Sequence, residues 1–530
     1  MTRPLAPTSF LILLLLLLPS LLVLWRFDDM PQFGEFHDDS IYYVGAKSLA
    51  ETQSYSIASL PGEPAQTKYP PLYPLLLSVA WRMDPSFPHN LATAAWISWL
   101  AWPALLVALA FYCPRLGFTA GRTWILLVLM ARNPFCILFS GRLVSELLFT
   151  VLLLLALLLV DRAAEHDSGP TIAIAAGVVA GLAYLTRTAG IVLLASGFLF
   201  LWLRKQRERG LVFAGVMLPF ILAWTLWSRL HQLPTADPDL IYYISYMGEQ
   251  FNNVTLTSLP LFVWKNLDGL LTGLGSLVLP QVLGVGFLKI LAQVIAVAMI
   301  AGVVRLVRRG DGLHYALFAV MSCVVLLIWH FPPNERLVLP LFPLALAGLL
   351  VELEHFFRLM GAGLKHREIG QRVVAGLMIA IAGLILAGSL ALQVFTGVNL
   401  MPAAARAQRK ANVPNRGAYA WIRAKTPADA NFFAYYDPLL YLYSGRHAIS
   451  HPLPPALWYH DDRATILRLY RELVPYARAH GLSYILLNEA DFRQDMDDQD
   501  RAQLEQSIRQ NPGLEHVWED GTAALYRVLP

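Results

Sequence analysis

Eleven long apolar runs constrain what this chain can fold into more than any other feature of its sequence. A straight helix needs about 20 apolar residues to cross a bilayer. A shorter run at residues 71–81 is expected to lie along the membrane surface. The sequence therefore predicts an α-helical polytopic membrane protein with about 11–13 transmembrane helices. The eleven runs are residues 10–25, 91–111, 124–139, 143–160, 171–184, 189–203, 211–227, 285–304, 315–329, 337–357 and 373–394.

The composition agrees with a membrane protein and argues against several other classes. Of 530 residues, 56% are hydrophobic and 15% are charged, against about 25% charged residues in soluble domains. The net charge of +4 is small, and Lys and Arg gather in short loops, so no nucleic-acid partner is expected. Cys113, Cys136 and Cys323 have neither zinc-type nor disulfide-type spacing.

Four basic loops indicate the orientation, because cytoplasmic loops carry an excess of Lys and Arg. With a cytoplasmic N-terminus, all four fall on the cytoplasmic side. The segments 26–90 and 231–284, and everything after residue 395, then lie outside. No small-residue cleavage site follows the first run, so it is interpreted as a retained helix rather than a signal peptide. The basic loops are residues 115–122, 204–209, 305–309 and 358–372.

The composition changes near residue 400, after the last apolar run. About 130 residues remain, enough for a small α/β domain. The chain is therefore divided into a transmembrane module, residues 1–397, which includes the external loop 26–90, and an external α/β domain, residues 398–530. The elements expected in this domain are strands at residues 431–436, 484–487 and 523–528 and a helical stretch at 464–480.

The first external loop carries the most informative motif, Gly-Glu-Phe-His-Asp-Asp-Ser-Ile-Tyr-Tyr, which begins at Gly34. Its adjacent carboxylates, Asp38 and Asp39, repel each other, which raises at least one pKa and suits a general base. Such a pair can also hold a divalent metal ion, so metal dependence stays open. The alternative is structural, with Asp39 or Ser40 capping a helix over residues 41–49.

A second motif, Lys-Tyr-Pro-Pro-Leu-Tyr-Pro, begins at Lys68 and includes Tyr69. Its prolines stiffen the backbone into an extended entry to the short helix that follows. A cation held there at the membrane surface is well placed to bind a lipid phosphate. The alternative is a lysine that only extends its ammonium group to the interface.

Five more charged residues, Arg142, Glu146, Arg187, Glu335 and Arg336, lie at external ends of apolar runs. Arginines at external ends oppose the positive-inside bias, and several together indicate an anionic partner. For Arg142 and Glu146 the alternative is a simple ion pair, since their i, i+4 spacing would bring them together on a helix.

Taken in order, these motifs resemble a known family. Asp-Asp-x-x-Tyr, Tyr-Pro-Pro-Leu-Tyr-Pro, Ser-Glu-Leu-Leu-Phe, Leu-Thr-Arg and Glu-Arg-Leu-Val-Leu-Pro are similar to motifs of the GT-C membrane glycosyltransferases of the protein-mannosyltransferase and aminoarabinose-transferase group. The resemblance covers residues 10–350, and the tail resembles the external domains of bacterial members. It implies the GT-C fold, a polyprenyl-phosphate sugar donor and a multi-pass protein of the bacterial inner membrane with a periplasmic C-terminal domain.

The resemblance also implies roles for individual residues. Asp38 matches the first acid of the family's acidic pair and would be the base, whereas Asp39 stands where glutamate is common. Lys68 falls where related enzymes carry a residue that contacts the donor phosphate. The leaving phosphate needs positive charge, which Lys68, Arg187 and Arg336 would supply while Asp38 deprotonates the acceptor in an inverting transfer. Further candidates for the cavity are Tyr42, Tyr69, Arg142, Glu146 and Glu335.

Two other functions compete with this one. Asp237-Pro-Asp239 and Asp495-Met-Asp497 match the Asp-x-Asp pattern of nucleotide-sugar enzymes, but they lie outside, and are interpreted as turn and surface acids. A transporter or lipid flippase would carry acidic or broken-helix sites near mid-membrane, for which Arg132-Asn-Pro134 is the main candidate. The sequence leaves open the sugar and whether the acceptor is a glycolipid, a glycan or a protein.

Overall fold

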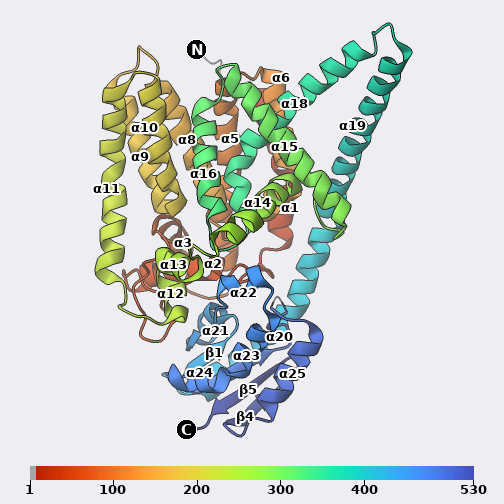
Figure 1. Ribbon diagram of the computed structural model, residues 1–530. Coiled ribbons are helices and arrows are strands. Elements are labelled where there is room, and N and C mark those ends of the chain that lie inside the picture. The colour runs from red at the N-terminus through yellow and green to blue at the C-terminus, as the bar shows by residue number, and fades with distance from the viewer. Residues whose placement is uncertain (1–6, 494) are drawn as a thin grey trace.

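Helices dominate the structure, a computed structural model that describes residues 7–493 and 495–530 (Figure 1). Apolar helices form a bundle, and a smaller domain with a five-stranded sheet lies at one end of it. Short helices and loops fill the region between the two. The first six residues of the predicted cytoplasmic N-terminus lie outside the described residues.

All eleven predicted apolar runs coincide with helices of the bundle. By length and composition, five described helical segments are able to cross a membrane, or six if a bent pair counts as one span, and four more described helices are apolar but shorter. The membrane fold is thus confirmed, while the total number of spans stays a prediction. These helices are α1 (Pro7–Arg26), α4 (Leu91–Trp99), α5 (Ala101–Tyr112), α6 (Ala120–Arg132), α7 (Pro134–Ser140), α8 (Glu146–Ala163), α9 (Pro170–Thr186), α10 (Val192–Leu203), α11 (Arg207–His231), α15 (Gly286–Arg308), α16 (Leu313–Leu327), α18 (Phe342–Gly363) and α19 (Ile369–Phe395).

The run at residues 124–139, expected as one span, is bent. Helices α6 and α7 meet there at an angle of 63°. Asn133 caps α7, because its side-chain oxygen accepts hydrogen bonds from the backbone N–H groups of Phe135 and Cys136. Pro134 occupies the first position of α7, where its missing N–H costs nothing. The bend places α7 against α1.

Helix α14 (Leu259–Ser276) was not expected from the sequence and lies within residues 231–284, whose external position stays a prediction. Lys265, Asn266 and Asp268 interrupt its apolar sequence, so no long run is visible there. In the structure α14 packs against α15 and α16 (Figure 1). The side-chain amide of Asn266 donates hydrogen bonds to two backbone carbonyls at the end of α16, which satisfies its polar group within the bundle.

Several short elements between the bundle and the sheet domain position the candidate residues. After α1, helix α2 packs against α3, which lies at the predicted surface run 71–81. Two short helices follow α11, and another precedes α18. Their bounds are α2 (Asp38–Glu51), α3 (Leu72–Met83), α12 (Pro238–Ile244), α13 (Tyr246–Asn253) and α17 (Glu335–Val338), with 3-10 turns at Cys113–Leu116, Thr188–Ile191 and Leu339–Leu341.

A continuous helical rod carries the chain from the bundle into the C-terminal domain (Figure 1). Helix α19 passes through a π-helical turn, Thr396–Leu400, into α20 (Met401–Lys425). The domain boundary predicted between residues 397 and 398 therefore falls inside this rod. Tyr419 and Ile422 of α20 pack on the sheet, which joins the rod to the domain core.

The sheet has the strand order β2-β1-β3-β5-β4, and this α/β domain confirms the predicted fold class. β1 is parallel to β2 and β3, whereas β5 is antiparallel to β3 and β4. Strands β1, β3 and β5 lie where the sequence predicted them; β2 and β4 were missed, and the predicted helix at 464–480 is divided into two. The elements are β1 (Asn431–Ala434), α21 (Asp437–Ser444), β2 (His447–Ile449), α22 (Pro455–His460), α23 (Arg463–Arg471), α24 (Leu473–Ala479), β3 (Tyr484–Asn488), α25 (Asp498–Arg509), β4 (Leu514–Glu519) and β5 (Ala523–Val528).

Candidate active site

The chain between α1 and α2 forms a turn that fixes the two adjacent acids. His37, the residue before α2, has a φ of 59°, a left-handed conformation uncommon for residues other than glycine. The Asp39 carboxylate supports this turn by accepting hydrogen bonds from the backbone N–H groups of Gly34 (2.9 Å) and Ser40 (2.8 Å). Burial raises the pKa of Asp39 to about 6 even though these two hydrogen bonds lower it. Asp39 thus has a structural role close to the capping alternative, although the capping position itself belongs to His37.

Asp38 begins α2, and its two oxygens contact different partners. The Tyr69 hydroxyl donates to Oδ1, and Arg336 Nη2 donates to Oδ2 at 2.7 Å. Burial alone would raise the pKa of Asp38, but the Arg336 guanidinium and the Tyr69 hydroxyl hold that pKa below its usual value. The side chain is still 26% exposed. Asp38 is therefore an ionised, oriented and accessible carboxylate.

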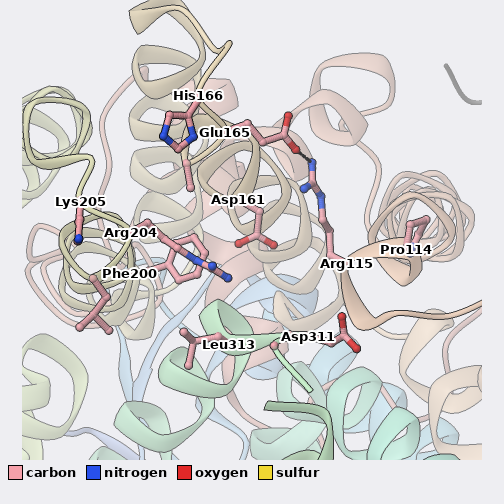
Figure 2. A pocket seen from close by; sticks show the side chains of 14 residues that line it. Pro114, Arg115, Asp161, Glu165, His166, Phe200, Arg204, Lys205, Asp311 and Leu313 are labelled. Atoms are coloured by element: carbon pink, nitrogen blue, oxygen red, sulfur yellow. Dashed lines mark ion pairs between the residues drawn. The ribbon is translucent and has the colours of Figure 1, made fainter. Parts of the chain in front are cut away.

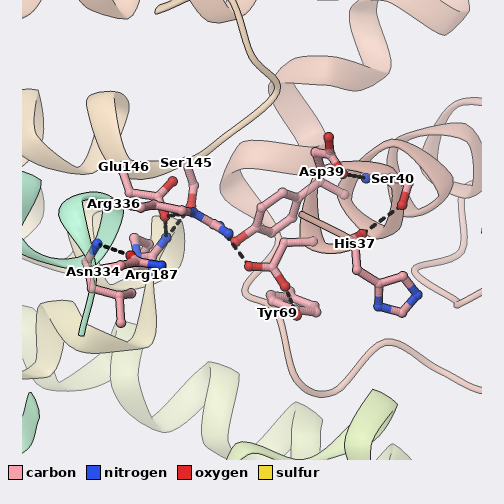
Figure 3. A network of polar contacts seen from close by, with 12 residues as sticks. His37, Asp39, Ser40, Tyr69, Ser145, Glu146, Arg187, Asn334 and Arg336 are labelled. Carbon is pink, nitrogen blue, oxygen red and sulfur yellow. Dashed lines mark hydrogen bonds and ion pairs between the residues drawn. The ribbon is translucent and has the colours of Figure 1, made fainter. Parts of the chain in front are cut away.

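Arg336 links Asp38 to a second acid, the almost fully buried Glu146. Arg336 Nε donates to Glu146 Oε1, and Arg187 Nη1 donates to the same oxygen at 2.6 Å (Figure 3). The three side chains come from α17, from the start of α8 and from the end of α9, so the network joins segments far apart in the sequence. Glu146 Oε2 has no hydrogen-bond partner among the described residues.

Arg142 pairs with Glu35 and not with Glu146, so the alternative of a simple i, i+4 ion pair is wrong. Arg142 Nη2 lies 2.7 Å from Glu35 Oε2. The guanidinium carbons of Arg142 and Arg336 lie 4.5 and 5.0 Å from the centre of the Phe36 ring, within the range of cation–π attraction. Arg142 and Glu35 also line an apolar cavity of about 740 Å³ formed by α1, α7 and the α19–α20 rod. Arg142 thus lies both beside the network and at this cavity.

Lys68 lies next to the network, where it forms a buried ion pair. Its ammonium donates to Glu249 Oε2 at 2.7 Å and lies 4.3 Å from the centre of the Tyr242 ring. The side chains of Lys68 and Glu249 are 4% and 8% exposed. Tyr69, the next residue in the sequence, donates a hydrogen bond to Asp38. Lys68 is therefore linked to Asp38 through its neighbour. The interface-lysine alternative is wrong, because the ammonium points into protein.

Of the two remaining candidates, Tyr42 contacts the network and Glu335 does not. The Tyr42 hydroxyl lies 3.1 Å from Ser145 Oγ, which also accepts a hydrogen bond from Arg187. In the described chain, Glu335 forms neither a hydrogen bond nor an ion pair with these side chains. The structure therefore brings together Asp38, Tyr69, Tyr42, Glu146, Arg187 and Arg336, with Lys68 and Arg142 adjoining.

Four residues of the site were missed by sequence reasoning. Ser145 stands inside the Ser-Glu-Leu-Leu-Phe motif, so a signal for it existed. Glu249 and Tyr242 carry no motif, although a buried lysine requires an acidic partner somewhere in the chain. His37 stands in the first motif, and its two ring nitrogens lie 2.8 Å from the Tyr242 hydroxyl and 2.8 Å from Asp437 Oδ1. Through this last contact the C-terminal domain reaches the residue before Asp38.

A second cavity, of about 590 Å³, lies at the opposite end of α8 (Figure 2). Its charged lining includes Arg115, Asp161 and Arg204. The 18 residues of α8 span about 27 Å, so this cavity is remote from Glu146. The cavity is lined by residues of two predicted basic loops, 115–122 and 204–209. It is also lined by Gly310, which directly follows the basic loop 305–309. These three loops therefore share one end of the bundle. The membrane side of that end stays a prediction.

The possible metal ligands of the described chain lie elsewhere than the paired acids. The oxygens of Asp38 accept hydrogen bonds from Tyr69 and Arg336. Those of Asp39 accept hydrogen bonds from backbone N–H groups. One ligand atom each of Asp237, Asp239 and His480 lie within 4.8 Å of one another, outside this network.

The network is suited to a proton transfer beside a developing anion. An ionised carboxylate with an exposed edge can take a proton from a hydroxyl. Two arginines next to it, in surroundings that largely exclude water, can stabilise negative charge more strongly than they could in solvent. A phosphate binds well to guanidinium groups, which offer paired N–H donors.

No protein-family profile matches the chain, and no curated protein matches it in sequence. Solved structures do match in fold. The crystal structure of ArnT from Cupriavidus metallidurans bound to undecaprenyl phosphate has a TM-score of 0.53 at 12% identity, covering 98% of this chain and 98% of that one. The archaeal oligosaccharyltransferase AglB from Archaeoglobus fulgidus, in complex with an inhibitory peptide and a dolichol-phosphate, has a TM-score of 0.51 at 12% identity, covering 92% of this chain and 70% of that one. The described chain therefore has the GT-C fold that ArnT and AglB share.

Proposed function

We propose that this protein is a membrane glycosyltransferase that moves a sugar from a polyprenyl-phosphate donor to an acceptor hydroxyl. The transfer is inverting, and Asp38 is the general base. The observation that carries the proposal is the contact of an ionised, partly exposed Asp38 with Arg336, which also binds Glu146 beside Arg187.

Asp38 is better suited to be the base than Asp39. Its pKa is held below the usual value, so it is ionised at neutral pH. Arg336 and Tyr69 fix its orientation, which a base needs to meet the acceptor hydroxyl at hydrogen-bond distance. Asp39 is 1% exposed and holds the preceding turn, so it supports the geometry from behind.

The leaving group of such a donor is a phosphate ester anion, which needs positive charge and no proton. Two of the proposed cations are Arg336, which contacts Asp38, and Arg187, which shares Glu146 with Arg336. Arg142 is the third, because its partner Glu35 is 33% exposed and this pair is able to open to an entering phosphate. Lys68 contributes its charge from a fixed position, since Glu249 holds it.

The prenyl chain needs an apolar site that ends near these cations. The cavity of about 740 Å³ along α1, α7 and the α19–α20 rod is lined mostly by apolar side chains and reaches Arg142. The similarity in fold to ArnT bound to undecaprenyl phosphate, and to AglB in complex with a dolichol-phosphate, supports a donor of this class.

The proposed location is the bacterial inner membrane, with the N-terminus cytoplasmic and the C-terminal domain periplasmic. Three basic loops gather at the end of the bundle opposite to Asp38, which supports this orientation. The acceptor hydroxyl belongs to a glycolipid, a glycan or a protein of the cell envelope.

The test replaces the base without changing its size. Asp38→Asn keeps an oxygen for Tyr69 or Arg336 but removes the basic lone pair, and we expect product formation to fall by about 100-fold or more. The measurement is mass analysis of envelope glycolipids and glycoproteins from cells that produce each variant, followed by initial rates in membranes. The control is Asp28→Asn, an exposed acid in the same loop.

Unchanged product with Asp38→Asn would remove Asp38 from the mechanism. A wild-type protein that relocates a lipid-linked sugar but forms no new glycosidic bond would instead favour the transporter or flippase alternative.

A further inference from the structure

The Asp237-Pro-Asp239 motif has no role in the proposed transfer, yet the structure places it at the junction of the two domains. The motif begins at Asp237, the residue before α12, and its other two residues are the first two of that helix. Opposite it lie His480, at the end of α24, and His451, in the loop after β2. Two acids of the membrane module thus meet two histidines of the C-terminal domain.

Three of these side chains, Asp237, Asp239 and His480, are close enough to share an ion. Asp237 Oδ2 lies 2.7 Å from His480 Nε2, and Asp239 Oδ2 lies 2.8 Å from His451 Nδ1. One ligand atom each of Asp237, Asp239 and His480 lie within 4.8 Å of one another. Four ligands around zinc are about 3.3 Å apart when each bond is about 2.0 Å, so small side-chain movements complete the set.

The hydrogen bonding of His480 shows that its Nε2 needs a positive partner. Nδ1 lies 3.0 Å from the backbone carbonyl of Tyr476, which can only accept a hydrogen bond, so Nδ1 carries the hydrogen. In the neutral ring Nε2 then presents a lone pair to the Asp237 carboxylate at 2.7 Å. Two acceptors at that distance repel each other unless a proton or a metal ion lies between them. A carbonyl on the second ring nitrogen is also the usual support of a metal-binding histidine.

The surroundings favour an ordered site over a chance surface cluster. The Asp239 side chain is only 9% exposed. The rings of His451 and His480 both pack on Tyr476, with centres 4.5 and 4.2 Å away. The Tyr476 hydroxyl in turn donates to the carbonyl of Ser450. Both histidines are therefore held in position by the same residue.

We propose that Asp237, Asp239 and His480 bind a divalent cation of the zinc class that joins the C-terminal domain to the membrane module. His451 supports the site from outside by holding Asp239. Mixed imidazole and carboxylate donors suit zinc, whereas calcium and magnesium prefer oxygen donors alone. The site is structural and stands apart from the proposed transfer chemistry.

The first test measures metal content in the full-length, tag-free protein. After incubation with Zn²⁺ and removal of free metal, we expect about one bound Zn²⁺ per chain by elemental mass spectrometry. His480→Gln should lose this metal while keeping a group that hydrogen-bonds to Asp237. The matched control, His516→Gln, changes a half-exposed histidine outside the cluster and should keep it.

A second measurement covers variants that fold poorly. Zn²⁺ should raise the Tm of the wild type and of His516→Gln, and a chelator should lower it again, because an ion that binds only the folded state stabilises that state. His480→Gln and Asp239→Asn should show neither shift. Wild type without bound Zn²⁺, or equal binding by His480→Gln, would overturn the proposal in favour of a protonated histidine. Neither result would bear on the transferase proposal, because metal content is measured without any donor or acceptor.

Discussion

At the scale of single residues, the site depends on how buried charges share partners. Glu146 is 1% exposed and is contacted by both Arg336 and Arg187. Without this anion, two guanidinium groups would face each other in a poorly hydrated space. Removing one member of a buried ion pair costs more than the pair contributes, because the other charge is left uncompensated. Glu146 therefore allows two arginines to lie beside Asp38.

The corresponding prediction concerns Glu146→Gln. The substitution keeps the shape of the side chain but leaves Arg187 and Arg336 without their shared carboxylate, and we expect the free energy of unfolding to fall by about 3 kcal/mol. Thermal unfolding in detergent measures the loss. Glu165→Gln, which removes a carboxylate paired with Arg115 near the surface, should cost less than about 1 kcal/mol. Equal losses for the two variants would contradict the assigned role of Glu146.

At the scale of elements, small residues allow two helices of the bundle, α15 and α18, to pack closely. A side chain at Gly302 of α15 would meet the backbone oxygen of Gly348 of α18 at 1.8 Å, and one at Gly348 would meet the carbonyl of Met299 at 2.4 Å. Close backbone approach at small residues is a main source of helix association in membranes. Helix α18 continues the helical segment that contains Arg336, so this packing also sets the position of the network.

Gly348→Ala tests this packing with a single methyl group. The new group has no room, so α15 and α18 must move apart, and we expect a loss of stability of about 1–3 kcal/mol, as in overpacked cores. The control is Gly361→Ala in the same helix, where nothing lies within 4 Å of the added carbon. Thermal unfolding of the two variants in detergent measures the difference in stability. A Gly348→Ala protein as stable as Gly361→Ala would disprove close packing of α15 and α18 at this position.

At the scale of the whole molecule, the C-terminal domain contacts the external loops and thereby the site. Asp437 is fully buried and lies 2.8 Å from His37, the residue before Asp38. Arg409 pairs with Asp29 at 2.6 Å, and His447 lies 3.2 Å from Glu63. The domain thus holds the loop that carries the candidate base, in addition to any contact it makes with an acceptor.

Asp437→Asn should therefore affect turnover from outside the reacting groups. Weakening its contact to His37 lets the turn before Asp38 relax, and misplacing a base by a fraction of an ångström gives a loss of about 10-fold or more. We expect kcat to fall while KM for the donor changes little, because the cations proposed to bind phosphate are untouched. Asp429→Asn, an exposed acid of the same domain, should leave both constants unchanged. A change in KM alone would indicate a role in donor binding instead.

The sequence by itself determined the features that depend on local chemistry. Apolar runs must face lipid or a protein core wherever they lie. All eleven long runs are helical in the structure. Strands β1, β3 and β5 were also found from their apolar residues. The motifs contain Asp38, Tyr69, Arg187 and Arg336, which lie together in the structure, while their roles stay predictions. Local patterns failed where polar residues interrupt a helix, as in α14, or where a capping residue such as Asn133 bends one.

Only the tertiary structure decided which charges pair. Asp38 and Arg336 are 298 residues apart, Lys68 and Glu249 are 181 apart, and His37 and Asp437 are 400 apart. The free energy of an ion pair depends on the distance between its charges and on the water excluded around them. Both quantities are set by the packing of distant helices, so the sequence could name the charged residues but could not assign their partners.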